Sequence, residues 1–355
     1  MTQQPKRRMI KWILYTLGGV FLLWVLLFAA GVAGYKWIEA SAKDGPTLHM
    51  AYHQAVSGLP LPERVISSTP EVTERQFITN FLDYQKPIRP KTVSATHPTA
   101  QKLKTMLAAL PPGIRRLAED ALLAIYPVEE DFGSATTVGV QDSQGQWLYA
   151  YLVMNLSDLD RTANDWGSWK EGSTFHSAKG YSVKVTLESP QNDTVENALQ
   201  FIFLHELGHA LGLHLKAHDF WVGNFVGPLT TQSPFFKVSW QQDKPGRLVT
   251  PWRKTYPLLA QLRFYAFENA PLGMNQAEEV YQNLSQTDFP SLYGATHPLE
   301  DFAESVAIYL HTQVLKKPYS VQVLKDGQVV AVYKSCITEN RCPAKVKAIQ
   351  DVLGL

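Results

Sequence analysis

The stretch from Phe203 to Gly212 contains a His-Glu-x-x-His pattern, formed by His205, Glu206 and His209. On an α-helix the two histidines are one turn apart and share a face. Two imidazoles at that spacing can bind one Zn²⁺ at roughly 2.0–2.1 Å each. Glu206 then stands beside the metal without binding it, where a carboxylate can accept a proton from water that Zn²⁺ has acidified. The spacing predicts a zinc site with Glu206 as the general base.

The residues before and within this pattern predict the helix that it requires. Asp193 or Thr194 can cap the helix, and Asp193 with Glu196 has the spacing of a capping box. A broad apolar stripe follows, made of Ala198, Leu199, Ile202, Phe203, Leu207, Ala210 and Leu211. Because the helix is apolar nearly all round before His205, we expect it to be central and buried. A core helix with two histidines by chance is the alternative, but buried His and Glu side chains need partners, which a metal supplies.

A catalytic zinc site needs three protein ligands and an open position, so the pattern lacks one ligand. The metzincin arrangement takes a third histidine after a glycine, at the position that Leu215 occupies here. His214 is one residue early, and the helix would have to end at Gly212. The other arrangement takes a carboxylate from a second helix.

The segment after Thr296 predicts such a second helix. Thr296 or His297 can cap it, with Pro298 in its first turn. Glu300 and Glu304 are one turn apart beside its expected buried face, which consists of Leu299, Phe302, Ala303, Val306 and Leu310. The alternative is that Glu300 only stabilises the helix N-terminus and that Glu304 is solvated. Because the first pattern lacks a ligand, we favour a carboxylate from this helix.

Two short motifs, in this order, resemble those of the gluzincin metallopeptidases related to anthrax lethal factor. The first is the His-Glu-x-x-His pattern, and the second places Tyr293 seven residues before Glu300 in a run that ends at Glu304. The resemblance implies a fold of the α+β class with a zincin-like catalytic domain. In such a domain the active-site helix packs on a small mixed sheet, and a second helix carries the third ligand.

The resemblance also implies a role for each matching side chain. One catalytic Zn²⁺ would be held by His205, His209 and Glu300. Glu206 would be the general base, and Tyr293 would face the substrate oxyanion. Glu304 would orient one of the ligands without touching the metal.

The chain between the two motifs is long for such a core, which predicts an insertion at about 216–292 within a catalytic domain of residues 135–316. The insertion is rich in aromatic residues: Phe220, Trp221, Phe225, Phe235, Phe236, Trp240 and Trp252. These side chains can wall a substrate cleft or, as is more common, pack beneath a long loop.

Strand patterns lie around the first motif and in the tail. Residues 136–140 and 146–154 predict a hairpin. Residues 181–188 alternate apolar and polar side chains, which predicts a half-exposed strand that either pairs with a substrate backbone or is purely structural. The tail, residues 317–355, predicts a hairpin around Asp326-Gly327. Cys336 and Cys342 follow it and are expected to form a disulfide in an exported protein.

The N-terminus predicts a membrane anchor. Residues 1–11 are basic, and the charge-free residues 12–35 would span roughly 36 Å as a helix, enough for a bilayer core. The basic residues predict a single-pass protein with a cytoplasmic N-terminus and a periplasmic or extracellular body. A cleaved signal peptide ending near residue 33 is the alternative, although the apolar run is long for one.

Residues 36–62 are expected to form a stalk, and residues 63–134 a helical region with helices over 71–84 and 100–125.

Composition and motifs together indicate the class of function. The formal net charge is +1 with no basic run beyond the N-terminus, so nothing indicates nucleic-acid binding. We expect a membrane-anchored extracytoplasmic zinc metallopeptidase that acts on a peptide or protein substrate. The alternatives are a cell-wall peptide or amide hydrolase of the same zinc class, and a zinc-stabilised envelope scaffold without turnover. Glu206 argues against a scaffold, because a structural zinc needs no base and leaves no open position.

Overall fold

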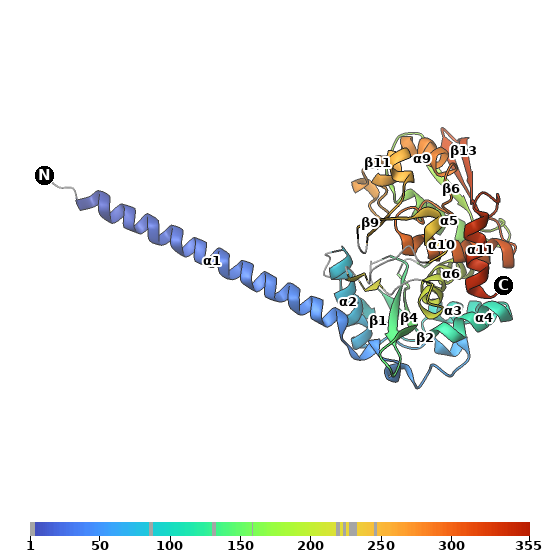
Figure 1. The fold of residues 1–355 in the computed structure, drawn as a ribbon, viewed down its shortest axis with the longest axis horizontal. Helices are drawn as coiled ribbons and strands as arrows, with labels where there is room; N and C mark the ends of the chain where they lie inside the picture. The colour runs from blue at the N-terminus through green and yellow to red at the C-terminus, as the bar shows by residue number, and fades with distance from the viewer. Residues whose placement is uncertain are drawn as a thin grey trace. The chain divides into compact units, whose positions relative to one another are not determined.

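The computed structural model describes residues 4–84, 88–129, 133–157, 159–217, 221–222, 225–226, 233–244 and 247–355. The chain forms two compact units, residues 1–45 and residues 46–355. The first unit consists of one long helix, α1 (Gln4–Lys43), drawn in blue in Figure 1. Among the described residues, Gly19–Leu48 is the one stretch long and apolar enough to span a membrane, with a mean hydropathy of 1.8. Its most apolar part is 0% buried, unlike a typical core helix, and both an anchor and a signal sequence fit its length and composition.

The second unit contains a four-stranded mixed sheet in the order β1-β2-β4-β3. Its strands are β1 (Lys91–Thr92), β2 (Leu122–Glu129), β3 (Ala135–Gln141) and β4 (Trp147–Asn155). β2 and β4 are parallel, whereas β1 and β3 run antiparallel to their neighbours. The predicted hairpin over 136–154 is confirmed. In its turn, Asp142 Oδ1 accepts hydrogen bonds from the backbone N–H groups of Gln144 and Gln146, each at 2.8 Å.

A second, antiparallel sheet has the order β13-β12-β6. It consists of β6 (Tyr181–Thr186), β12 (Ser320–Lys325) and β13 (Gln328–Lys334). The predicted tail hairpin is confirmed, and its turn residues Asp326 and Gly327 have φ of +48° and +79°, the left-handed conformation that a tight hairpin turn requires. The predicted disulfide between Cys336 and Cys342 is also present, followed by α11 (Pro343–Leu353).

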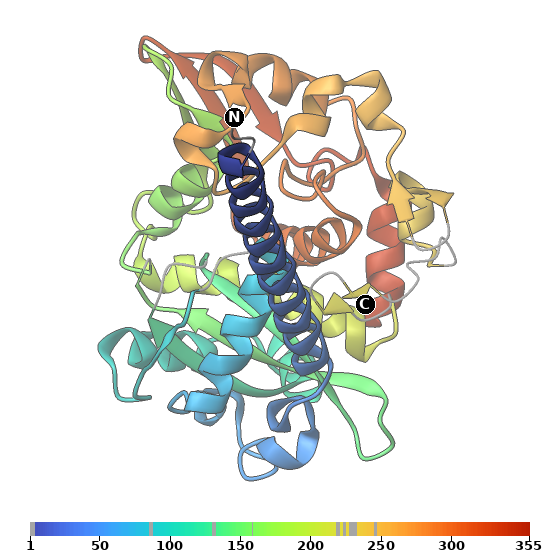
Figure 2. The same ribbon diagram turned by 90° about the vertical axis from the view of Figure 1, so that its left-hand side faces the viewer.

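Three helices lie between the two sheets, as Figures 1 and 2 show. They are α5 (Ala163–Gly172), α6 (Val195–His214) and α10 (Pro298–Tyr309). α6 packs on β3 and β4 and, on another side, against α10, while α5 packs on β6. The fold is therefore a mixed α/β arrangement with small sheets, and α6 is central and almost fully buried, as expected.

The start of α6 differs in one detail from the expectation. Thr194 is the N-cap and accepts the backbone N–H of Asn197 at 3.3 Å. The Asp193 carboxylate instead accepts the Thr162 hydroxyl at 3.0 Å and the Asn164 backbone N–H at 2.8 Å. Asp193 therefore ties the start of α5 to the start of α6, and the predicted capping box is not formed.

The predicted helix over 100–125 is wrong, whereas the predicted helix over 71–84 is confirmed as α2 (Pro70–Tyr84). The single predicted helix is replaced by α3 (Pro98–Ala108), α4 (Pro112–Ala121) and the start of β2. Proline lacks a backbone N–H and disfavours a helical residue before it, so the Pro111-Pro112 pair breaks the helix. β2, which is parallel to β4, is buried on both faces, and such an apolar run has no period that distinguishes it from a helix.

Residues in the segment expected to be a stalk form short 3₁₀ turns, η1 (Pro46–Leu48), η2 (Met50–His53) and η3 (Leu61–Arg64). Leu48 and Leu61 are buried in the second unit.

The remaining short strands are β5 (Phe175–His176), β7 (Trp221–Val222), β8 (Phe225–Val226), β9 (Gln241–Lys244), β10 (Arg247–Val249) and β11 (Leu272–Gly273). The remaining helices and turns are α7 (Phe236–Ser239), α8 (Trp252–Thr255), η4 (Pro257–Gln261), η5 (Phe267–Asn269), η6 (Met274–Gln276), α9 (Ala277–Leu284) and η7 (Leu310–Val314).

The aromatic residues of the predicted insertion mostly pack in the core. Phe235, Phe236 and Trp240 are buried, and Trp252 is partly buried against the core. Phe220 lies outside the described residues, as do the side chains of Trp221 and Phe225. These positions therefore favour packing beneath a loop over lining a cleft.

Candidate metal centre

α6 and α10 approach each other closely at Gly208. A Cβ atom at this position would lie 2.8 Å from the Cα atom of Ala303 and 2.9 Å from its carbonyl oxygen. Because real Cβ atoms essentially never lie so close to backbone, only glycine permits this approach. The contact brings the first turns of α10 against the His-Glu-x-x-His turn of α6.

Gly208→Ala is therefore expected to lower the free energy of unfolding of the metal-free protein. Overpacking costs about 1–3 kcal/mol, which exceeds the gain of about 1 kcal/mol that alanine brings inside a helix. Gly113→Ala in α4 is the matched control, because nothing lies within 4 Å of the added Cβ. Chemical denaturation of both variants measures the effect, and equal stability of the two would contradict the close packing inferred here.

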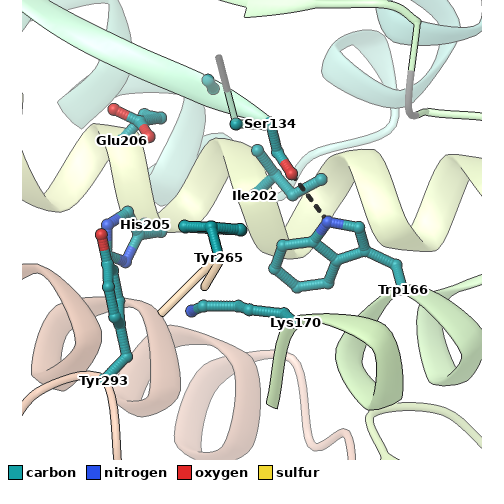
Figure 3. Close-up of a pocket in the computed structure, with 10 residues that line it drawn as sticks. Ser134, Trp166, Lys170, Ile202, His205, Glu206, Tyr265 and Tyr293 are labelled. Carbon is teal, nitrogen blue, oxygen red and sulfur yellow. Dashed lines mark hydrogen bonds between the residues drawn. The ribbon is translucent and has the colours of Figure 1, made fainter. Parts of the chain in front are cut away.

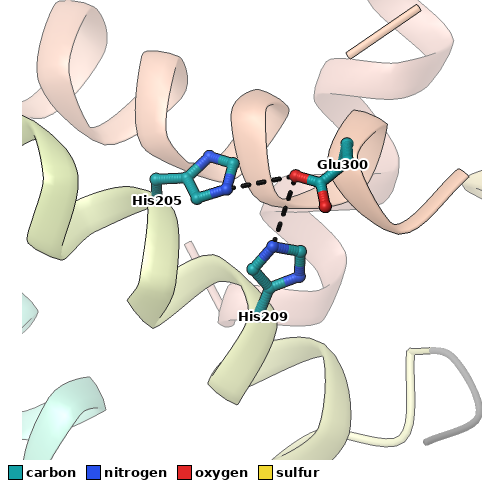
Figure 4. A group of neighbouring side chains, drawn as sticks. All are labelled: His205, His209 and Glu300. Atoms are coloured by element: carbon teal, nitrogen blue, oxygen red, sulfur yellow. Dashed lines mark ion pairs between the residues drawn. The ribbon is translucent and has the colours of Figure 1, made fainter. Parts of the chain in front are cut away.

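His205, His209 and Glu300 converge on one point, as Figure 4 shows. Glu300 Oε2 lies 3.2 Å from His205 Nε2 and 3.5 Å from His209 Nε2. The candidate ligand atoms of the three side chains all lie within 4.8 Å of one another. Ligand atoms bound tetrahedrally to one zinc at roughly 2.0–2.2 Å lie roughly 3.3–3.6 Å apart. The three side chains could therefore hold a metal ion with little movement.

The electrostatics of this group fit a cation. Glu300 Oε2 is buried, and its nearest partners among the described residues are the imidazole nitrogens of His205 and His209. A buried anionic oxygen is costly unless a cation adjoins it. Burial alone would raise the pKa of Glu300, but His209 and His205 hold that pKa well below its usual range. Burial alone would lower the pKa of His205, but Glu300 and Glu304 raise it to about 10. The carboxylates thus stabilise positive charge here, which a proton or a metal ion can supply.

The start of α10 places Glu300 in its first turn. His297 is the N-cap: its Nδ1 accepts the backbone N–H of Leu299 at 3.3 Å, and Pro298 follows. Thr296, the other predicted cap, instead donates its hydroxyl to the Tyr293 carbonyl at 2.6 Å. The expectation of a capped helix with an early proline is confirmed, with His297 as the cap.

Glu304 lies one turn further along α10, behind His205. Its Oε1 atom is 2.9 Å from His205 Nδ1 and also accepts the Lys170 ammonium at 2.8 Å. Burial alone would raise the pKa of Glu304, but Lys170 and His205 lower it to about 2. Glu304 is thus an ionised, buried carboxylate in the position of a group that orients a metal-binding imidazole.

Glu206 is held by the edge strand β3. The Thr137 hydroxyl lies 2.7 Å from Glu206 Oε2 and 2.9 Å from the Glu206 carbonyl oxygen. The hydroxyl has one hydrogen and can donate a hydrogen bond to either oxygen. Glu206 itself is buried. Thr137 therefore fixes the carboxylate that the sequence indicates as a general base.

Tyr293 shares one pocket with His205 and Glu206, shown in Figure 3. Its ring centroid lies 5.6 Å from that of His205 and 4.7 Å from that of Phe264. Lys170, Trp166 and Tyr265 also line the pocket.

Tyr265 has a left-handed backbone with φ of +59°, a strained conformation for a tyrosine. Its backbone N–H donates to the Ser173 hydroxyl at 2.8 Å, directly after α5. This part of the predicted insertion, unlike its buried aromatic residues, reaches the pocket.

The structure places His214 away from the three converging side chains. Its Nδ1 atom lies 2.9 Å from the Leu148 carbonyl oxygen on β4, and its ring packs against Tyr149. This position gives no support to the metzincin arrangement.

β6 does not offer an open edge to a substrate. The backbone N–H of Val185 donates to the Ser168 hydroxyl at 2.9 Å, and that of Leu187 donates to Asn164 Oδ1 at 2.6 Å. α5 therefore covers the side of β6 opposite β12, which favours the structural alternative for residues 181–188 over pairing with a substrate backbone. Among the described strands, β3 pairs with β4 alone and adjoins the pocket through Ala135.

Comparisons of the chain with protein-family models, with curated proteins and with solved structures found no match. Any functional assignment therefore depends on the geometry and chemistry of the site itself. Thr137, Lys170 and Tyr265 belong to that geometry but carry no signal in the sequence, because each lies outside the two motifs.

Proposed function

We propose that this chain is a zinc metallopeptidase of the gluzincin type, with His205, His209 and Glu300 as zinc ligands. The observation that carries the proposal is the convergence of these three side chains beside Glu206 and Tyr293. A structural zinc site uses four protein ligands and has no need of an adjacent base, whereas three ligands leave a position for water or substrate.

The surrounding side chains have the chemistry that peptide hydrolysis requires. A zinc ion bound by the three ligands would acidify water and polarise the carbonyl of a peptide bond. Glu206, oriented by Thr137, accepts the proton of the attacking water and returns it to the leaving amine. The Tyr293 hydroxyl donates to the carbonyl oxygen as negative charge develops there. Glu304 keeps the His205 ring in its binding orientation through Nδ1.

The architecture supports a zincin-like catalytic domain as part of this proposal. α6 packs on a mixed sheet, and α10 brings the third ligand to it, which is the arrangement that the resemblance implies. β3 takes the role expected of a substrate-binding edge strand, because it adjoins the pocket and has one described strand partner. An extended peptide can add to such an edge through backbone hydrogen bonds.

Hydrolysis of a peptide library by the full-length, zinc-loaded protein in detergent tests the proposal. We expect new peptide termini by mass spectrometry, loss of cleavage on chelation and recovery when zinc is restored. A protein that binds one equivalent of zinc and leaves every peptide intact would favour a scaffold. Cleavage of cell-wall amides alone would assign the same site to a different substrate.

We propose further that α1 anchors the protein with the second unit outside the cytoplasm. The long apolar helix supports an anchor, and the basic residues before it favour a cytoplasmic N-terminus. A reporter that is active only outside the cytoplasm should work when fused after Leu355, and extraction from membranes should need detergent. A soluble mature form that begins near Gly34 would show cleavage instead.

A further inference from the structure

A buried lysine lies beside the candidate metal centre, and it has no role in the peptide hydrolysis proposed above. Lys170, in the last turn of α5, is 5% exposed. Burying an ammonium group is expensive unless the group is paired. Figure 3 shows its Nζ atom near Tyr293 within the pocket.

The first contact of Lys170 leads to a metal ligand. Its Nζ atom donates to Glu304 Oε1 at 2.8 Å, and the same oxygen lies 2.9 Å from His205 Nδ1. His205 Nε2, on the other side of the ring, lies 3.2 Å from Glu300. Lys170, Glu304 and His205 thus form a chain of contacts in which the lysine binds the carboxylate oxygen that adjoins the imidazole.

The second contact of Lys170 is with the pocket tyrosine. Its Nζ atom lies 4.3 Å from the ring centroid of Tyr293, within the range of a cation–π interaction. A weaker contact of the same kind, at 5.5 Å, involves Trp166. One ammonium group therefore contacts both the carboxylate behind His205 and the phenol that would face the substrate.

Glu171, the next residue along α5, forms no ion pair with Lys170 among the described residues. Glu171 is buried beside it but accepts the Tyr281 hydroxyl on α9. Among the described residues, the ion pair of Lys170 is with Glu304. The ammonium group therefore contacts the Tyr293 ring in addition to its ion pair with Glu304.

We propose that Lys170 is a positioning residue for the proposed reaction, holding Glu304 against His205 and fixing the Tyr293 ring beside the metal centre. The inference depends on the proposed function, since both of its targets act through the zinc site. Removal of the ammonium group should therefore affect zinc retention through Glu304 and turnover through Tyr293, by two separable routes.

Lys170→Met, which keeps the length of the side chain but removes its charge, tests both routes. Zinc release to a chromogenic chelator should become roughly 10- to 100-fold faster, the usual effect of losing a group that supports a ligand. The kcat for peptide hydrolysis should fall with little change in KM. Lys170→Arg should restore part of both, and Lys184→Met, on the exposed face of β6, should change neither.

A double-mutant comparison keeps the test valid if Lys170→Met alone fails to fold because Glu304 is left without its partner. Glu304→Gln with Lys170→Met removes both charges and is compared with Glu304→Gln alone, in which the amide oxygen can still accept a hydrogen bond from Lys170. We expect equal rates of zinc release in the two, because the route through Glu304 is already lost. We expect a lower kcat in the double variant, because the contact with Tyr293 is lost only there.

The outcomes separate this inference from the proposed function. A Lys170→Met protein that is less stable but retains the zinc release rate and kcat of the wild type would reduce Lys170 to a structural role and overturn the inference. A wild-type protein that binds no zinc would overturn the proposed function, and the inference with it.

Discussion

Glu206→Gln is expected to bind zinc as the wild type does and to lose roughly 10²-fold or more in kcat. A general base of this kind contributes roughly 10²- to 10⁴-fold, and the amide cannot accept the proton of the attacking water. The substitution is nearly isosteric and keeps an oxygen that can accept the Thr137 hydroxyl, so fold and metal binding should persist. Steady-state hydrolysis of a cleaved peptide, with zinc content measured on the same samples, gives the result.

A matched control for this substitution lies on the same helix. Glu196 is in the first turn of α6, partly exposed and away from the site, so Glu196→Gln should leave kcat unchanged. Undiminished hydrolysis by Glu206→Gln would remove Glu206 from the role assigned to it. Loss of zinc in that variant would instead place Glu206 among the ligands.

Glu300→Ala is expected to weaken zinc binding by more than about 100-fold. Loss of a group that only supports a ligand costs roughly 10- to 100-fold, and this variant loses a ligand itself. It also leaves His205 and His209 without the anionic oxygen 3.2 and 3.5 Å away. Competition with a chelator of known affinity measures the change.

Two further variants define what this result means. His214→Ala should bind zinc as the wild type does, because His214 contacts the Leu148 carbonyl and not the metal centre. Glu304→Ala should weaken zinc binding more than His214→Ala and less than Glu300→Ala, since Glu304 contacts His205 at the ring nitrogen that faces away from the metal centre. A larger loss for Glu304→Ala than for Glu300→Ala would move the ligand one turn along α10.

The converging ligands could be predicted because their positions depend on local rules. Helical spacing places His205 and His209 on one face, and a cap with an early proline places Glu300 in a first turn. Those rules do not bring two helices together: the approach of α6 to α10 depends on Gly208 lying against Ala303, 95 positions apart in the sequence.

The supporting residues could not be predicted, for a physical reason. Thr137 lies in a strand of the predicted hairpin and Lys170 lies on α5, but both reach the site through tertiary packing, which no local pattern indicates. The strand β2 was also missed, because a strand with both faces buried has the same apolar pattern as the continuation of a helix. Local patterns thus predicted the candidate ligands, whereas the side chains that contact them appear only in the folded structure.

A crystal structure of the zinc-loaded protein, with anomalous scattering measured at the zinc edge, tests the central claim most directly. We expect one strong peak at roughly 2.0–2.2 Å from His205 Nε2, His209 Nε2 and a Glu300 oxygen, with an open position toward Glu206 and Tyr293. A peak bound by Glu304 or by His214 in place of Glu300, or a site closed by a fourth protein ligand, would contradict it.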